Sequence, residues 1–167
     1  MKKLLCLVLL VSMLTLSFAA SADQAYTGDG YTLSYPDTWT VGLDQEGVDF
    51  VLMMTDGISN FNMVRTDLGM SFTPEQIEQL LMPMLLSQYQ EQFENVTQIE
   101  QESPIVLGEN TFNVIGFNIS MFGFDMYMEQ YVTMVGSVAY IFTATFQGVT
   151  EEALIEVYST LSTFTAQ

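Results

Sequence analysis

The chain is poor in basic residues and in the side chains that perform most protein chemistry. It contains no histidine, one cysteine and three lysine or arginine residues, against 20 aspartate and glutamate residues. Lys2, Lys3 and Cys6 all lie within the first six residues. Arg65 is therefore the sole basic side chain in the rest of the sequence.

These absences exclude several functional classes once the N-terminal segment is set aside. After residue 22 the chain can form no disulfide, cysteine nucleophile, lysine Schiff base or histidine general base, and it lacks the nitrogen and sulfur ligands that zinc prefers. The negative charge also disfavours nucleic acids and anionic lipid surfaces, because their phosphates would be repelled. Cations and basic partners would be attracted instead.

The first 22 residues have the organisation of a secretory signal peptide. A basic start precedes an apolar run from Leu4 to Phe18, and Ala20-Ser21-Ala22 offers a small-residue cleavage site. An uncleaved membrane anchor is the alternative, but the run is shorter than the roughly 20 apolar residues that span a bilayer. Cys6 lies at the wrong end of the run for a lipoprotein. We expect cleavage after Ala22 and a secreted or periplasmic protein without a stable membrane anchor.

The segment Gly30–Asp44 alternates apolar and polar residues on either side of a Pro36-Asp37 corner. This pattern predicts two short strands joined by a tight turn, with Trp39, the single tryptophan, just beyond it. Trp39 could belong to an exposed recognition platform, but a core position at one end of the sheet is favoured. A strand that is apolar on both faces is expected over Val48–Thr55. The next strand contains Arg65, which needs a carboxylate partner if it turns inward.

Two helices interrupt and close this series of strands. Thr73-Pro74-Glu75-Gln76 combines an N-cap residue, a proline at the first helical position and a capping-box glutamine, so a helix begins there. Pro83 should kink this helix or divide it at about Met82. Thr150 caps the closing helix. The predicted buried face of the first helix comprises Ile77, Leu80, Leu81, Met84, Leu85, Tyr89 and Phe93.

Between the helices, hairpin signals join successive strands from Val96 to Phe146, including the pair Gly136-Ser137. Hairpins in place of crossovers predict an α+β fold, with an antiparallel β-sheet flanked by helices. We expect a flexible N-terminus over residues 23–29 and a single domain over residues 30–167.

The segment GYTLSYPDTWTV, Gly30–Val41, resembles the opening of small bacterial secreted proteins of the PsbP-like superfamily, whose fold is shared with the Ran-binding Mog proteins. The resemblance continues through VLGENTFNVIGFN, MEQYVTMVGSVAYIFTATF and the closing Leu161-Ser162-Thr163-Phe164, in the order that the family uses. It implies an α/β/α sandwich and an accessory, binding or assembly role. It supplies no catalytic motif, and the Ran and photosystem partners belong to distant branches.

Two kinds of candidate metal site can be recognised. Asp44, Glu46 and Asp49 form the densest local group of carboxylates, the ligands that calcium prefers. They match no calcium-loop spacing, so a solvated acidic surface is favoured. Met126 and Met128 share one face of a predicted strand and could ligate Cu(I), but packing in the core is the simpler interpretation. No cofactor is expected.

The most hydrophobic predicted loop is the turn around Gly123. Phe122, Gly123, Phe124 and Met126 form the candidate ligand-binding or partner-binding site, as a surface for an apolar partner. Cover by one of the protein's own helices is favoured over exposure.

The composition and the resemblance together predict a non-enzymatic extracytoplasmic binding or accessory protein, whose partner is a protein or a small apolar ligand. A cation-binding protein that uses surface carboxylates or methionines is the main alternative. An enzyme would have to rely on a pair of carboxylates alone, as in glycoside hydrolysis, and is not favoured.

Overall fold

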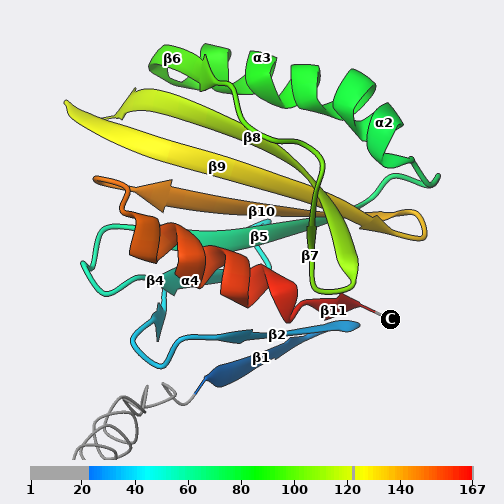
Figure 1. The fold of residues 1–167 in the computed structure, drawn as a ribbon, viewed down its shortest axis with the longest axis horizontal. Helices are drawn as coiled ribbons and strands as arrows, with labels where there is room; N and C mark the ends of the chain where they lie inside the picture. The colour runs from blue at the N-terminus through cyan, green and yellow to red at the C-terminus, as the bar shows by residue number, and fades with distance from the viewer. Residues whose placement is uncertain (1–22, 122, 167) are drawn as a thin grey trace, which may run out of the picture.

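An eight-stranded antiparallel sheet forms the centre of the protein (Figure 1). The computed structural model describes residues 23–121 and 123–166. Along the sheet the strands follow the order β3, β4, β5, β10, β9, β8 and β6, and β7 pairs with the other end of β8. The bounds are β3 Thr40–Val41, β4 Phe50–Met53, β5 Asn60–Asp67, β6 Glu94–Ile99, β7 Ile105–Leu107, β8 Asn110–Met121, β9 Phe124–Val135 and β10 Val138–Phe146. The predicted α+β class with an antiparallel sheet is confirmed.

The N-terminal part of the described chain belongs to a second, three-stranded sheet. Its strands are β1 Gln24–Gly28, β2 Tyr31–Tyr35 and β11 Thr165–Ala166, with β2 in the centre. Most of the stretch expected to be flexible, residues 23–29, is therefore strand β1, which pairs with β2 along its whole length. The two strands on either side of Pro36 do not pair with each other, because β2 and β3 belong to different sheets.

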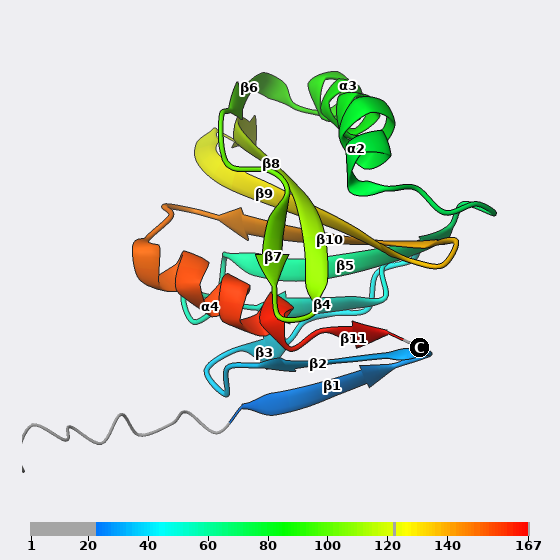
Figure 2. The same cartoon turned by 45° about the vertical axis from the view of Figure 1, so that its right-hand side comes forward.

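Helix α4, Glu151–Ser162, and the small sheet cover one face of the large sheet (Figures 1 and 2). Thr150 caps this helix by accepting a hydrogen bond from the N–H of Ala153 at 3.2 Å. Trp39 lies in the core between these layers, where it is 0% exposed. Its indole N–H donates to Oε2 of Glu156 on α4 at 3.0 Å. The core position predicted for Trp39 is confirmed.

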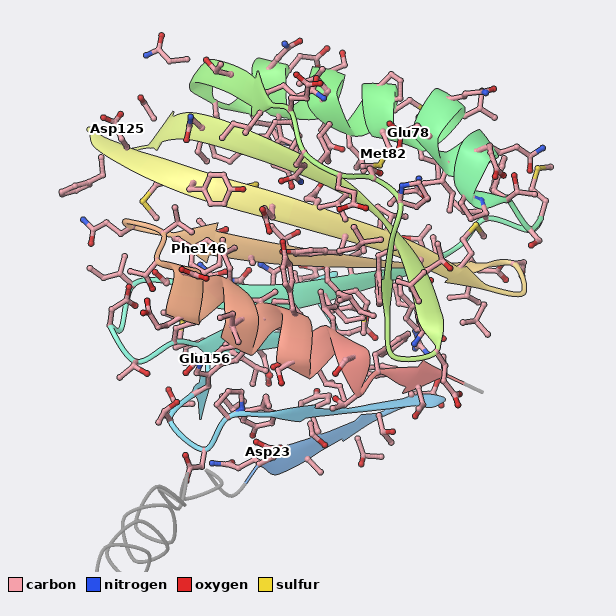
Figure 3. All side chains as sticks on the ribbon, in the orientation of Figure 1. Asp23, Glu78, Met82, Asp125, Phe146 and Glu156 are labelled. Carbon is pink, nitrogen blue, oxygen red and sulfur yellow. The ribbon has the colours of Figure 1, made fainter. Side chains whose placement is uncertain are left out.

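A second helical layer lies on the opposite face of the large sheet. It consists of α2 Pro74–Gln76, a π-helical turn η1 Ile77–Leu81 and α3 Met82–Gln92. Thr73 forms the predicted capping box with Gln76. Figure 3 shows Glu78 and Met82 on the side of this layer that faces the sheet. The carboxylate of Glu78 accepts a hydrogen bond there from the amide of Asn113 at 3.1 Å.

The π-helical turn rotates the apolar face of α3. Pro83 has no N–H to bond to the carbonyl four residues earlier, and the N–H of Met82 bonds to the carbonyl of Ile77 five residues earlier. The additional residue in this turn shifts the phase of the side chains that follow. Leu80 and Met84, which we predicted on the buried face, are 52% and 67% exposed, whereas Met82 is buried.

Alternation along the long strands supplies apolar side chains to both faces of the large sheet. On β8, for example, Val114 joins the core beneath α4 and Ile115 joins the core beneath α3. The layers therefore match the α/β/α arrangement that the resemblance implied. Within residues 23–121 and 123–166, no helix is long and apolar enough to cross a bilayer.

Candidate ligand cavity

A cavity of about 420 Å³ lies between α3 and the large sheet. Its walls are largely apolar, and a volume of this size lies within the range of small-molecule sites. α3 packs over β6, β8 and β9, so the cavity opens on the side of β10 and β5. The apolar lining residues are Leu81, Met84 and Leu85 on the helical side, Val132, Ala139 and Ile141 on the sheet, and Leu68 after β5.

The mouth of the cavity is polar and carries no positive charge. Ser87, Gln88 and Glu91 contribute from α3, and Thr66 contributes from the end of β5. All four residues are exposed, so they meet solvent where a ligand would enter. The carboxylate of Glu91 makes this rim unfavourable for an anionic group.

Three hydrogen-bonded polar side chains, buried Gln130 and Thr143 and partly buried Tyr89, lie between α3 and the sheet but do not line the cavity. The amide nitrogen of Gln130 on β9 donates to the hydroxyl of Tyr89 on α3 at 2.6 Å and to Oγ1 of Thr143 on β10 at 3.1 Å. Burial raises the pKa of Tyr89, although its hydrogen bonds with Thr143 and Gln130 act in the opposite direction. Gln130 is 3% exposed, and its Oε1 has no hydrogen-bond partner within the described residues.

A second buried polar group lies on the opposite face of β9, toward α4. Glu129 is 2% exposed and accepts hydrogen bonds from the hydroxyls of Tyr127 and Tyr131. The amide of Gln101, oriented to satisfy both of its ends, donates to Oε1 of Glu129 at 3.0 Å and accepts from the N–H of Gly116 at 3.0 Å. Burial, reinforced by the neighbouring carboxylate, raises the pKa of both tyrosines. The carboxylate oxygens and both ends of the Gln101 amide have protein partners, so this group stabilises the packed interior and leaves no atom for a ligand.

Asp44, Glu46 and Asp49, the carboxylates predicted as a possible metal site, do not form a group that could bind one ion. Asp49 is partly buried and forms an ion pair with Arg65, whose Nε lies 3.5 Å from Oδ1 of Asp49. The backbone N–H of Arg65 donates to Oδ2 of the same carboxylate at 3.0 Å, so Asp49 supplies the partner that Arg65 was expected to need. Asp44 and Glu46 are exposed. Among residues 23–121 and 123–166, no three acidic side chains are close enough to hold a metal ion together.

The candidate residues at the β8–β9 turn are divided between surface and core. Phe122 lies outside the described residues. Gly123 is exposed with a φ of 83°, and Phe124 is 57% exposed. Met126 is buried in the core beneath α3, together with Met128, as the packing interpretation of these methionines requires. Figure 3 places Asp125 at the far end of this hairpin.

The cavity was not predicted from the sequence. Its apolar wall residues follow the same alternation as ordinary core residues, so no local pattern distinguishes them. A signal for the buried polar groups was present in the adjacent pair Glu129-Gln130, within a largely apolar strand. Alternate residues of a strand point to opposite faces, so this pair places its two polar side chains on opposite faces of β9, and the structure covers both faces.

No protein-family model matches the sequence, and no curated protein matches it. Solved structures of similar fold include a crystal structure from Bacteroides thetaiotaomicron, with a TM-score of 0.61 and 17% identity. That match covers 86% of this chain and 48% of the other, so this chain spans about half the length of the Bacteroides protein.

Two further solved structures match over nearly their whole length. PsbP (CyanoP) from Synechocystis has a TM-score of 0.57 and 13% identity, with 90% of this chain and 96% of that chain covered. LpqN, involved in cell envelope biogenesis of Mycobacterium tuberculosis, has a TM-score of 0.54 and 13% identity, with 86% and 91% covered. Together with the order of its strands and helices, these similarities show that the chain has the PsbP-like fold.

Proposed function

We propose that the protein is a non-enzymatic, extracytoplasmic binding or accessory protein that holds a small apolar ligand beneath α3. The observation that carries this proposal is the cavity of about 420 Å³ between α3 and β10, with Leu81, Leu85, Val132 and Ile141 in its walls. An apolar molecule would gain about 25 cal/mol for each Å² of apolar surface that it removes from water there.

The other parts of the proposal rest on composition and on the N-terminal segment. The basic start, apolar run and small-residue site that end at Ala22 support export. A binding role without catalysis is supported by the lack of histidine, lysine and cysteine after residue 22, since these side chains perform most general-base and nucleophilic chemistry. The similarity to LpqN and CyanoP supports the fold on which this role is built.

The test is the binding of an uncharged fluorophore, prodan, to the processed protein purified after export. We expect saturable enhancement of its fluorescence. Ala139→Leu places added side-chain atoms in the cavity and should weaken binding about tenfold, equivalent to about 1.4 kcal/mol. Ala25 is exposed on β1, so Ala25→Leu is the matched control and should leave affinity unchanged.

Two outcomes would contradict the proposal. One is fluorescence that rises linearly with the dye and never saturates, and the other is equal affinity in the wild type and in a folded Ala139→Leu variant. Circular dichroism and urea unfolding establish that both variants are folded. Thermal unfolding with and without calcium tests the cation-binding alternative, which predicts a higher Tm when the ion binds.

A further inference from the structure

The lining of the cavity changes in polarity along its helical side. Leu81 and Leu85 supply apolar surface, whereas Gln88 and Glu91, further along α3, supply polar groups. These positions recur at three- and four-residue spacing, so they lie on one face of the helix. Leu85 and Glu91 are about 9 Å apart along the helix axis. A molecule in the cavity can therefore contact apolar side chains and a carboxylate at the same time.

The charge of Glu91 is not neutralised by a basic side chain within residues 23–121 and 123–166. Arg65 is the sole basic residue of that part of the chain. Its guanidinium forms ion pairs with Asp29 at 3.4 Å and with Asp49 at 3.5 Å. It also points to the opposite face of β5 from Thr66, which lines the cavity. The mouth of the cavity therefore keeps a net negative charge.

The end of α3 acts in the same direction as this carboxylate. The helix ends at Gln92, and its last turn carries no basic residue. The carbonyl groups at the C-terminal end of a helix carry partial negative charge, which attracts cations within the last turn. Glu91 belongs to this turn and is exposed, so a positive group beside it would remain in contact with water. Such a group would avoid most of the cost of burying a charge.

We propose that the cavity selects an amphiphilic cation, whose apolar chain lies against Leu85 and Ile141 and whose ammonium group lies at the mouth beside Glu91. This inference rests on the proposed function, because it names the ligand class of the same cavity. The apolar lining supplies most of the affinity, and Glu91 supplies the preference for a positive over a negative head group.

The experiment displaces prodan with three ligands that share an eight-carbon alkyl chain: octylammonium, octanol and nonanoate. In about 0.15 M sodium chloride the Debye length is about 8 Å, so distant carboxylates contribute little. Octylammonium should displace the dye at a concentration about three- to tenfold lower than nonanoate. Methylammonium, which has the charge without the chain, should not displace the dye at these concentrations. Equal displacement by octylammonium and nonanoate, or displacement by methylammonium as effective as that by octylammonium, would overturn the inference.

Glu91→Gln removes the charge and keeps the length of the side chain. It should bring octylammonium and nonanoate within about twofold of each other and leave displacement by octanol within about twofold of the wild type. Glu152 is an exposed glutamate on α4, which covers the opposite face of the sheet, so Glu152→Gln is the matched control and should retain the preference. An unchanged preference in folded Glu91→Gln, or an equal loss in Glu152→Gln, overturns the inference.

The failures of the two proposals can be distinguished. Absence of saturable prodan binding in the wild type overturns the proposed function and this inference with it. Normal prodan binding without preference for octylammonium over nonanoate overturns this inference alone. The comparison of these two ligands in the wild type remains decisive even if Glu91→Gln does not fold.

Discussion

The hydroxyl of Tyr131 donates a hydrogen bond to Oε2 of Glu129, the residue two positions before it on the same face of β9. Tyr127, two positions before Glu129, donates to Oε1 of the same carboxylate. The two tyrosines that flank Glu129 on one face of the strand, together with Gln101, thus satisfy a buried carboxylate without a basic residue. This local arrangement compensates for the shortage of positive charge in the chain.

Removing the Tyr131 donor should destabilise the protein measurably. Tyr131→Phe leaves Oε2 of Glu129 buried without this hydrogen bond and should lower the free energy of unfolding by about 1–3 kcal/mol in urea titrations. Tyr35 is also buried, but its hydroxyl donates to the neutral amide of Gln24 at 3.0 Å. Tyr35→Phe is therefore the control, with an expected loss of about 1 kcal/mol or less. A larger loss for Tyr35→Phe would contradict this explanation.

Stability should fall at alkaline pH. Burial, reinforced by the charge of Glu129, raises the pKa of Tyr127, Tyr131 and Tyr158 above the ordinary tyrosine value of about 10. A pKa that is higher in the folded state contributes stability fully below the unfolded pKa and loses it as pH rises above that value. Urea unfolding from about pH 8 to pH 11 should show a decline that begins near pH 10. Tyr131→Phe should make the decline shallower, and a flat profile would contradict the linkage.

Gly108 in the β7–β8 turn should tolerate no side chain. It has a φ of 61°, and a Cβ there would lie 2.1 Å from the carbonyl oxygen of Ser162 at the end of α4. Gly108→Ala combines a strained backbone with a clash against backbone, and should cost at least about 2 kcal/mol. Gly136 has a φ of 63° but no atom near the corresponding Cβ position, so Gly136→Ala should cost about 1 kcal/mol. Equal losses in thermal or urea unfolding would show that the contact with Ser162 is not tight.

Salt should stabilise the protein. The processed chain would carry 20 acidic residues and Arg65 alone as a basic side chain, so the folded state concentrates negative charge. Raising ionic strength from about 0.01 M to 0.15 M shortens the Debye length from about 30 Å to about 8 Å and weakens this repulsion. We expect Tm to rise by at least about 2 °C in sodium chloride, measured by circular dichroism. A Tm that does not change would indicate that the carboxylates are too far apart to interact.

Much of the local structure could be predicted from short patterns. Thr73 begins a helix because its side chain and that of Gln76 can satisfy free backbone N–H groups within four residues. Gly136-Ser137 joins β9 to β10 because the turn needs only its own residues. Trp39 is buried as its size and apolar surface favour. The cap and the turn depend on chemistry that is complete within a few positions of the chain, whereas the burial of Trp39 follows from its residue type and is completed by distant partners such as Glu156.

The predictions that were wrong, and the features that were not predicted, depend on contacts between distant residues. β1 pairs with β2, but the sheet to which β2 belongs also requires β11 at the other end of the chain. The helix divides at Met82 as Pro83 predicted, but the π-helical turn there and the exposure of Leu80 and Met84 were not predicted. The cavity lies between α3 and the β10 side of the sheet, so it depends on how the helix sits on the strands.

The sequence by itself determined the shortage of positive charge, the succession of most strands and helices, and the placement of Glu129 and Gln130 on opposite faces of their strand. Alternation and capping are local, so these features hold whichever elements become neighbours. Only the tertiary structure decided that Glu129 meets Tyr127, Tyr131 and Gln101, whereas Oε1 of Gln130 has no hydrogen-bond partner within the described residues. The reason is that a buried polar group is satisfied or left unsatisfied by whatever packs against it, and those neighbours include α3, β10 and the segment after β6.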